Sequence, residues 1–375
     1  MNIRTITCHD VYNLGASLQA YALQQYLKNQ GHEVQIIDYK PYYLNGHFKL
    51  WTISNNIYDK PIIKQLYLLA KLPGRLSALR RKKVFDAFTS TYLQLTKRYN
   101  SYEELKADPP HADYYIAGSD QIWNTLFQNG RDAAFYMDFG SPSVKRISYA
   151  ASFATPSIVP EYKDFVINKL KGIDAISIRE KTLLPLLSEL GRPDGVAVCD
   201  PVFLLSKEEW NKTLTNSESL STYEEKYLLV YLTDKGKQIE KIAQEIKQKT
   251  GWKIYSVGGI KAQFVDKYFR NAGPFEFVHL IQNAQFVISN SFHATAFSII
   301  MGTKFCVVNR ADAINERMKS ILEDYGLSNR LVYKYEDNLL EDIDINKIDT
   351  FSQQIVGYSR KWLNSQLENN TTIKY

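Results

Sequence analysis

The pattern of hydrophobic and polar positions predicts an alternation of strands and helices along most of the chain. Short apolar runs that suit buried strands are followed by segments with apolar residues at helical spacing. The clearest strand-like runs of the first half are 3–8, 34–37, 114–117, 147–154, 175–178 and 196–199. Nearly continuous apolar runs are typical of strands buried on both faces, so we expect a mostly parallel sheet covered by helices.

A polar stretch at 206–225 interrupts this alternation. The alternation then resumes with segments at 227–233, 236–249, 253–257, 274–283 and around Phe286. We therefore predict an α/β fold of two Rossmann-like, parallel-sheet domains facing a cleft. The first domain is expected over 1–215 and the second over 216–345. A C-terminal helix and tail over 346–375 would follow, with the helix able to return to the first domain.

The most informative stretch joins the strand near Phe286 to an apolar helical segment through Asn290, Ser291, Phe292 and His293. Ligands of parallel sheets bind outside the carboxyl ends of the strands, and free N–H groups at a helix start favour anions. Imidazole titrates near neutral pH, so His293 is a candidate acid or base. The alternative is a histidine that bonds only its own loop. Ser291 is a candidate ligand contact, although capping of the helix is the commoner role.

Two other strand ends carry polar residues of the same kind. The loop 9–16 follows the first strand, and we expect its Asn13 and Gly15 to contact a substrate. It has no GxGxxG pattern, so a nicotinamide cofactor is not indicated. After the run 114–117 come Ser119 and Asp120, of which Asp120 would serve as a base or orient a sugar hydroxyl. Its rival role is to cap the turn that follows.

Candidate cations lie close to these strand ends in sequence. Arg179 ends the run 175–178, where its guanidinium can grip a carboxylate or phosphate in bidentate fashion. A surface ion pair with Glu180 is the alternative for this arginine. Three more cations follow the histidine and are expected to share its cleft: Lys304, Arg310 and Arg317.

Composition and absent motifs argue against several classes of site and cofactor. The three cysteines are far apart and lack CxxC spacing, so neither a disulfide framework nor a zinc cluster is expected. HExxH, Walker and GxSxG motifs are absent from the sequence, and we expect no metal and no cofactor. The first residues are too short an apolar run for a signal peptide, and no run reaches the ~18 apolar residues of a membrane span. A cytoplasmic setting fits best.

A basic helical insert is predicted at about 57–98. Its stretch 60–83 holds eight Lys or Arg and no Asp or Glu, interleaved with leucine and isoleucine. We favour a pair of helices whose apolar stripe packs on the domain and whose basic face is solvated. Contact with an anionic membrane at the inner face, or with another polyanion, is the alternative. No nucleic-acid-binding motif accompanies the charge, so nucleic acid is not expected as a partner.

Taken together, the motifs are similar to those of the polysaccharide pyruvyl transferase family. They are the segments 13–20, 118–124, 177–180, 200–201 and 291–298. The resemblance implies a GT-B-like fold and transfer of pyruvate from phosphoenolpyruvate onto a sugar of a surface polysaccharide or its precursor, as a ketal. The acceptor, a nucleotide- or lipid-linked saccharide, would bind the first domain, and the anionic donor the second. His293 and Asp120 would be catalytic, and Arg179 with Arg310 or Arg317 would hold the donor.

The sequence departs from many members of that family at the histidine motif. Those members resemble Gly-Arg-Leu-His, where this chain has Asn290, Ser291, Phe292 and His293. Either another cation, such as Arg317 or Lys304, replaces the arginine absent at Ser291, or the donor differs. The alternatives are therefore a GT-B-type glycosyltransferase that uses a sugar nucleotide and a non-catalytic, membrane-associated scaffold of glycan assembly.

Overall fold

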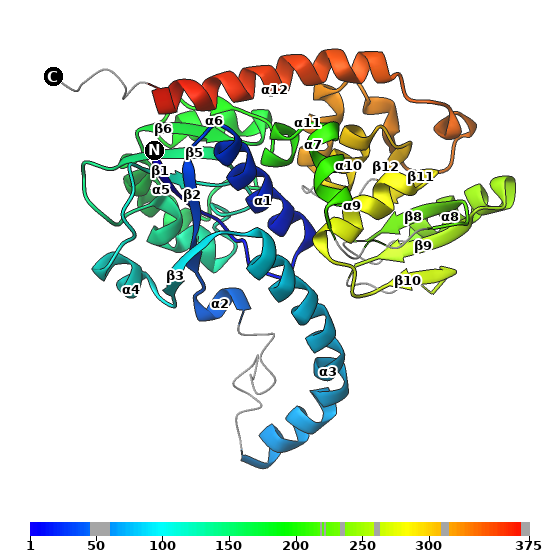
Figure 1. Cartoon of the computed structure of the whole chain (residues 1–375), viewed down its shortest axis with the longest axis horizontal. Coiled ribbons are helices and arrows are strands. Elements are labelled where there is room, and N and C mark those ends of the chain that lie inside the picture. Colours follow the sequence, from blue (N-terminus) through cyan, green and yellow to red (C-terminus); the bar gives the residue numbers. More distant parts are fainter. Residues whose placement is uncertain are drawn as a thin grey trace.

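The fold is built on two parallel sheets, one in each half of the chain (Figure 1). The computed structural model describes residues 1–45, 61–217, 220, 223–232, 237–258, 263–308 and 315–368. The first sheet holds β1 (Asn2–Ile6), β2 (Glu33–Tyr39), β3 (Leu95–Tyr99), β4 (Tyr114–Ala117), β5 (Lys145–Ala151), β6 (Ala175–Ile178) and β7 (Val196–Ala197). The second holds β8 (Tyr227–Tyr231), β9 (Lys253–Val257), β10 (Lys267–Phe269), β11 (Phe286–Ser289), β12 (Phe305–Val308) and β13 (Leu331–Val332). The predicted two-sheet α/β fold is thus confirmed, and the sheets lie on either side of the predicted boundary at residue 215.

Both sheets place their strands in the same order. The first runs β3-β2-β1-β4-β5-β6-β7 and the second β10-β9-β8-β11-β12-β13, and every pairing is parallel. In each sheet the order reverses beside the first strand, between β1 and β4 or between β8 and β11. Crevices form at such switch points, outside the carboxyl ends of the strands. A ligand-binding crevice is therefore expected beside the segments that follow β4 and β11.

Helices cover the sheets and fill the space between them (Figure 1). The α-helices are α1 (Leu14–Asn29), α2 (Tyr42–Asn45), α3 (Pro61–Tyr92), α4 (Tyr102–Ala107), α5 (Lys163–Leu170), α6 (Leu184–Glu189), α7 (Lys207–Thr215), α8 (Lys237–Thr250), α9 (Pro274–Asn283), α10 (Phe292–Met301), α11 (Asn315–Asp324) and α12 (Ile345–Glu368). Short 3₁₀ turns are η3 (Gln128–Arg131), η4 (Ala133–Tyr136), η5 (Pro160–Tyr162), η6 (Lys181–Leu183), η7 (Pro201–Leu204), η8 (Ser328–Arg330) and η9 (Asp337–Leu340). None of the helices in the described ranges is both long and apolar enough to cross a membrane.

One buried hydrophobic cluster extends across both halves of the chain. The ring of Tyr21 on α1 lies 5.2 Å from Phe275 on α9, and Trp210 on α7 lies 5.0 Å from Phe297 on α10. These residues belong to a single buried cluster that runs from the first sheet to the second. Aromatic pairs of this kind add about 0.5–1.5 kcal/mol each to the free energy of unfolding, beyond their burial. This packing therefore fixes the position of the carboxyl edge of one sheet relative to that of the other.

The last helix, α12, returns to the first domain. Figure 1 shows it lying along both halves of the molecule. The hydroxyl of Tyr26 on α1 donates to Asn364 Oδ1 at 3.1 Å, and that of Tyr114 on β4 donates to the carbonyl of Gln366 at 3.1 Å. The helix that ends the chain thus ties the second domain back to the first.

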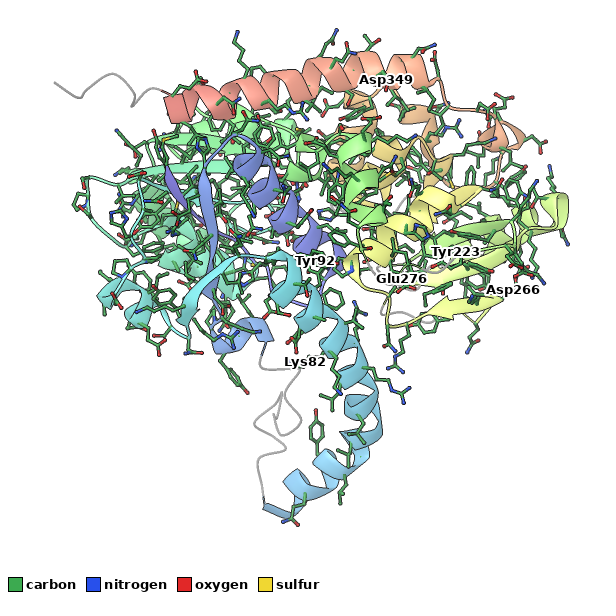
Figure 2. All side chains as sticks on the ribbon, viewed as in Figure 1. Lys82, Tyr92, Tyr223, Asp266, Glu276 and Asp349 are labelled. Carbon is green, nitrogen blue, oxygen red and sulfur yellow. The ribbon has the colours of Figure 1, made fainter. Side chains whose placement is uncertain are left out.

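The basic insert forms one helix, α3, so the predicted pair of helices is wrong. Pro73 and Gly74 lie in the middle of this helix in the sequence. A proline removes one hydrogen bond and bends a helix without always ending it. Figure 1 shows α3 curved and projecting away from the body of the protein. Figure 2 labels Lys82 and Tyr92 in the part of α3 nearer the two domains.

Candidate active site

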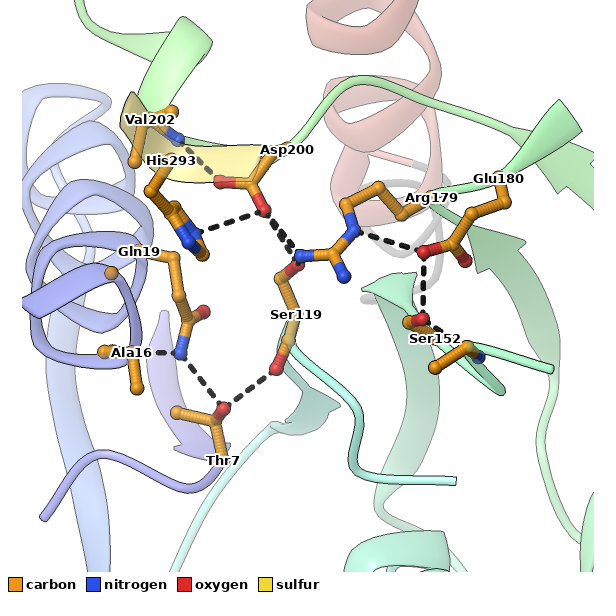
Figure 3. Close-up of polar contacts among 12 residues, drawn as sticks. Thr7, Ala16, Gln19, Ser119, Ser152, Arg179, Glu180, Asp200, Val202 and His293 are labelled. Carbon is orange, nitrogen blue, oxygen red and sulfur yellow. Dashed lines mark hydrogen bonds and ion pairs between the residues drawn. The ribbon is translucent and has the colours of Figure 1, made fainter. Parts of the chain in front are cut away.

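A polar network joins the carboxyl ends of four strands of the first sheet to the start of α10 in the second domain (Figure 3). Thr7, Ser119, Arg179 and Asp200 follow β1, β4, β6 and β7, and His293 lies in the first turn of α10. The sequence analysis predicted three of these five residues: Ser119, Arg179 and His293. They meet because parallel strands of one sheet end at the same edge, and the two sheet edges face each other.

Asp200 is the centre of this network. Its Oδ2 atom accepts hydrogen bonds from Ser119 Oγ at 3.0 Å and Arg179 Nη1 at 2.9 Å, and it lies 3.7 Å from His293 Nε2. The other oxygen, Oδ1, accepts from the backbone N–H of Val202 at 3.1 Å and so caps η7. Sequence reasoning gave Asp200 no role of its own. An Asp before Pro is a common helix start, which explains the cap but does not reveal the contacts across the sheet.

Arg179 is buried between two carboxylates and is not a surface residue. Its Nε lies 3.2 Å from Glu180 Oε1, and its guanidinium lies 4.6 Å from the ring of Phe292. Burial alone would lower the pKa of Arg179, but the charges of Glu180 and Asp200 raise it above its usual value. The guanidinium is therefore a permanent positive charge at this edge of the sheet.

Two buried polar atoms of the same pair make no hydrogen bond within the described part of the chain: Arg179 Nη2 and Glu180 Oε2. The other carboxylate oxygen of Glu180 accepts from Ser152 Oγ at 2.7 Å, which fixes the side chain. An unsatisfied buried polar group costs about 1–3 kcal/mol of folding free energy. Such a cost is common where a site is shaped for a polar ligand rather than for the empty protein.

His293 packs against the start of α1 at Gly15. A Cβ atom at position 15 would lie only 2.0 Å from His293 Nδ1, so no side chain fits there. The imidazole is 12% exposed and lies edge-on to the ring of Phe292, with the ring centroids 5.3 Å apart. Glycine at position 15 thus lets the first domain approach the histidine of the second. This contact accounts for Gly15 without a ligand.

The starts of α1 and α10 are capped differently. Asn13 Oδ1 accepts from the N–H groups of Gly15 and Ala16 at 3.0 and 3.2 Å, which is the arrangement of an N-cap. Ser291 holds the same position before α10, but its side chain makes no capping bond. The capping role favoured for Ser291 is therefore not observed. A helix start of this kind suits an anion.

Asp120 follows β4 in a strained conformation. Its φ of 78° lies in the left-handed region, which is uncommon for a residue other than glycine. Its carbonyl accepts from Ile122 N at 2.8 Å and Ser152 N at 3.1 Å, which holds the turn. Within the described ranges its carboxylate makes no hydrogen bond, so the capping alternative is not observed, and the charge acts on Arg179. Strain of this kind tends to collect at functional sites.

A second layer of hydrogen bonds fixes the distance between α1 and β4. Thr7 Oγ1 donates to the carbonyl of Ser119 at 2.7 Å and accepts from Gln19 Nε2 at 3.0 Å. Gln19 lies on α1 and also donates to the carbonyl of Ala16 at 3.0 Å. Thr7 and Gln19 were not predicted as site residues, because neither residue type signals chemistry by itself.

The three cations predicted downstream of His293 have different outcomes. Lys304 precedes β12 and pairs with Asp342 at 2.8 Å, so the structure places it at the amino end of its strand. This is the edge of the sheet opposite His293, and closeness in sequence was a poor guide to closeness in space. Arg310 lies outside the described residues. Arg317 belongs to α11, but its side chain is outside them too.

A cavity of about 470 Å³ adjoins the Arg179 side of the network. Its lining includes Arg179, Asp200 and Phe292, together with Ile321 of α11, Tyr325 just after that helix, and Ile355 and Tyr358 of α12. This volume suits a small ligand with both charged and apolar parts. In the described ranges there is no group of three or more His, Cys, Asp or Glu residues that would hold a metal ion.

Solved structures share the fold of this chain at low sequence identity. A UDP-N-acetylglucosamine 2-epimerase matches with a TM-score of 0.52 and 12% identity, over 100% of this chain and 97% of its own. The UDP-GlcNAc 2-epimerases of Neisseria meningitidis, bound to UDP-GlcNAc, and of Methanocaldococcus jannaschii, in complex with UDP-GlcNAc and UDP, each match with a TM-score of 0.50 and 11% identity. Each match covers 99% of this chain and 100% of the other. These likenesses concern the fold, which is of the GT-B type.

Comparison of sequences identifies the family. No curated protein matches the chain. The family model described as polysaccharide pyruvyl transferase matches residues 13–312, which is more than half of the chain. The matched range includes Asn13, Asp120, Arg179, Asp200 and His293. The chain therefore belongs to the polysaccharide pyruvyl transferase family.

Proposed function

We propose that this protein transfers pyruvate from phosphoenolpyruvate onto a sugar of a surface polysaccharide or its precursor, as a ketal. The observation that carries the proposal is the buried carboxylate of Asp200, which contacts the cation Arg179 and lies beside His293. An anion-binding group and an acid–base group thus share one site, in a chain of the pyruvyl transferase family. We propose that this site works in the cytoplasm.

The donor would bind through its negative charges. Phosphoenolpyruvate carries a carboxylate and a phosphate, and Arg179 supplies a permanent cation for one of them. The N–H groups at the start of α10 and the hydroxyl of Ser291 suit the other. Arg310 and Arg317 remain the candidates for a second cation. Fixed charges and helix N–H groups would make a metal ion or cofactor unnecessary.

The reaction needs two kinds of proton transfer. Protonation of the donor's methylene carbon makes it a methyl group and leaves positive character on the adjacent carbon. A sugar hydroxyl adds to that carbon and gives its proton to a base. Phosphate leaves with the electrons of its C–O bond, and a second hydroxyl loses its proton as it closes the ketal. We assign these transfers to His293 and Asp120, since imidazole and carboxylate side chains are among those that act as general acids and bases.

The acceptor would be a nucleotide- or lipid-linked saccharide held by the first domain. Asn13, Ser119 and Asp120 lie at the carboxyl ends of β1 and β4, which is where a polar acceptor would meet the donor. A second candidate function is transfer of a sugar from a sugar nucleotide. It is favoured by Ser291, which stands where many members of the family have arginine, and by neighbours of similar fold that bind UDP-GlcNAc.

One assay separates the two functions. The protein is incubated with phosphoenolpyruvate or with sugar nucleotides and a panel of saccharide acceptors. We expect phosphate release and a pyruvate ketal by NMR, both lost in His293→Asn and retained in the matched control His279→Asn on α9. Consumption of a sugar nucleotide, with no ketal across the panel, would instead establish the glycosyltransferase.

A further inference from the structure

The helix α3 has a surface that catalysis does not use. It leaves the body of the protein where the two domains meet and projects beyond both (Figure 1). Near its C-terminal end, Arg81 Nη2 donates to the carbonyl of Tyr12 at 3.1 Å, and Phe88 lies 5.0 Å from Phe275. Tyr12 belongs to the loop that leads to Asn13. The root of α3 is therefore fixed to both domains, beside the site.

The projecting part of α3 carries exposed leucines in a basic stretch of sequence. Leu69 and Leu76 are 65% and 50% exposed, and their spacing of two helical turns places them on one face. In the sequence, Lys64, Lys71 and Arg75 recur at helical spacing, offset from the two leucines by roughly 130°. Large apolar side chains left in water, on a segment this rich in cations, favour a partner that suits both.

The charge of this segment decides which partner fits. Residues 60–83 carry eight Lys or Arg and no Asp or Glu. A second copy of the helix would bring like charges together, and a nucleic acid would leave the leucines in water. An anionic bilayer takes the leucines into its interfacial region and pairs the cations with its phosphate groups. We propose that α3 docks the protein onto an anionic membrane surface, without crossing it.

This geometry brings the site to the membrane. The root of α3 lies beside the loop that carries Tyr12 and Asn13, so docking through the projecting part holds the cleft near the bilayer. The inference is independent of the reaction, because it concerns residues that touch neither Arg179 nor His293. The membrane proposal can therefore be contradicted while the proposed function stands, and the proposed function can be contradicted while the membrane proposal stands.

The test is co-sedimentation of the full chain with vesicles of phosphatidylcholine, with or without phosphatidylglycerol, at low and high salt. We expect binding only to the anionic vesicles, weakened by salt. Each cation near such a surface contributes about fivefold in affinity, so Lys64→Glu with Lys71→Glu should weaken binding at least about thirtyfold. Leu69→Ser with Leu76→Ser should weaken it at least about tenfold.

Matched controls remove the effects of net charge and of general hydrophobicity. Lys212→Glu with Lys361→Glu makes the same change of charge on exposed positions of α7 and α12, and Leu126→Ser removes an equally exposed leucine. These controls should bind like the original chain, and all variants should keep its melting temperature and its activity on a water-soluble acceptor. Equal losses in the controls, no binding to anionic vesicles, or a dimer in solution that Leu69→Ser with Leu76→Ser dissociates would each overturn the proposal.

Discussion

At the scale of single residues, one carboxylate organises the site. Asp200 is fully buried and contacts Ser119 and Arg179, with His293 beside it. Its contacts join residues that are far apart in sequence, so its side chain helps to set the geometry of the site. Replacement of a buried partner of this kind leaves other polar groups unpaired, which is costlier than the loss of a surface pair.

We predict that Asp200→Asn lowers the turnover number at least about a hundredfold. The substitution removes the negative charge beside Arg179 and changes the side chain next to which His293 is oriented. The free energy of unfolding should fall by about 3 kcal/mol, the usual result of breaking a buried ion pair. The matched control is Asp194→Asn, whose partner Arg192 lies 2.8 Å away in a pair where Asp194 is 57% exposed. Urea unfolding should show a loss below about 1 kcal/mol for the control. Equal losses would contradict the role given to Asp200.

Gly15 supplies a second prediction at this scale. Gly15→Ala should displace the imidazole of His293 or the start of α1, because the added Cβ would lie 2.0 Å from Nδ1. We expect activity to fall at least about tenfold, as small misplacements of catalytic groups do. Gly172→Ala is the control, since its nearest neighbour would be 3.5 Å away, an ordinary contact. Full activity of Gly15→Ala in a steady-state assay would show that His293 is not held as described.

At the scale of elements, two helices that each begin after a small polar residue are capped differently. Asn13 caps α1 through two N–H groups, whereas Ser291 makes no capping bond before α10. Both positions were predicted as substrate contacts. That prediction rested on the position of polar residues between strand and helix, and such residues also cap helices.

The two helix starts can be told apart by substitution. Asn13→Ala should lower the free energy of unfolding by about 1 kcal/mol, the usual cost of a lost N-cap. Ser291→Ala should leave that free energy within about 0.5 kcal/mol and raise the KM for the donor, because its hydroxyl supports no helix. Thermal unfolding and donor titration measure the two effects. A loss of stability without a change in KM for Ser291→Ala would remove it from the binding site.

At the scale of the whole molecule, the alternation of strands and helices was enough to predict the fold. Buried parallel strands leave continuous apolar runs, so the two sheets and the position of His293 at a strand end followed from the pattern. The prediction that Lys304 shares the cleft of His293 was wrong, because closeness in sequence does not distinguish the two ends of a strand. Asp200 and Thr7 were missed as site residues because their roles arise from contacts between distant strands.

The well-filled interior also makes the three cysteines unreactive. Burial raises the pKa of Cys199 to about 11 and of Cys306 to about 12, and raises that of Cys8 well above its usual value. Little thiolate therefore exists near pH 8, so a thiol reagent should modify the native protein slowly and faster as the pH rises. Absorbance of the released reagent group should show three thiols after denaturation. Rapid reaction of the native chain would mean that the interior opens readily.

The contact between Gly15 and His293 joins two domains across the site. The histidine comes from the second domain, while the glycine and Asp200 come from the first. A motion that parted the two domains would therefore take His293 away from Asp200 and from Gly15. If the proposed acceptor enters by such a motion, the proposed reaction needs a closing step that brings these residues together again, and the spacing of the domains would then bear on which acceptors react.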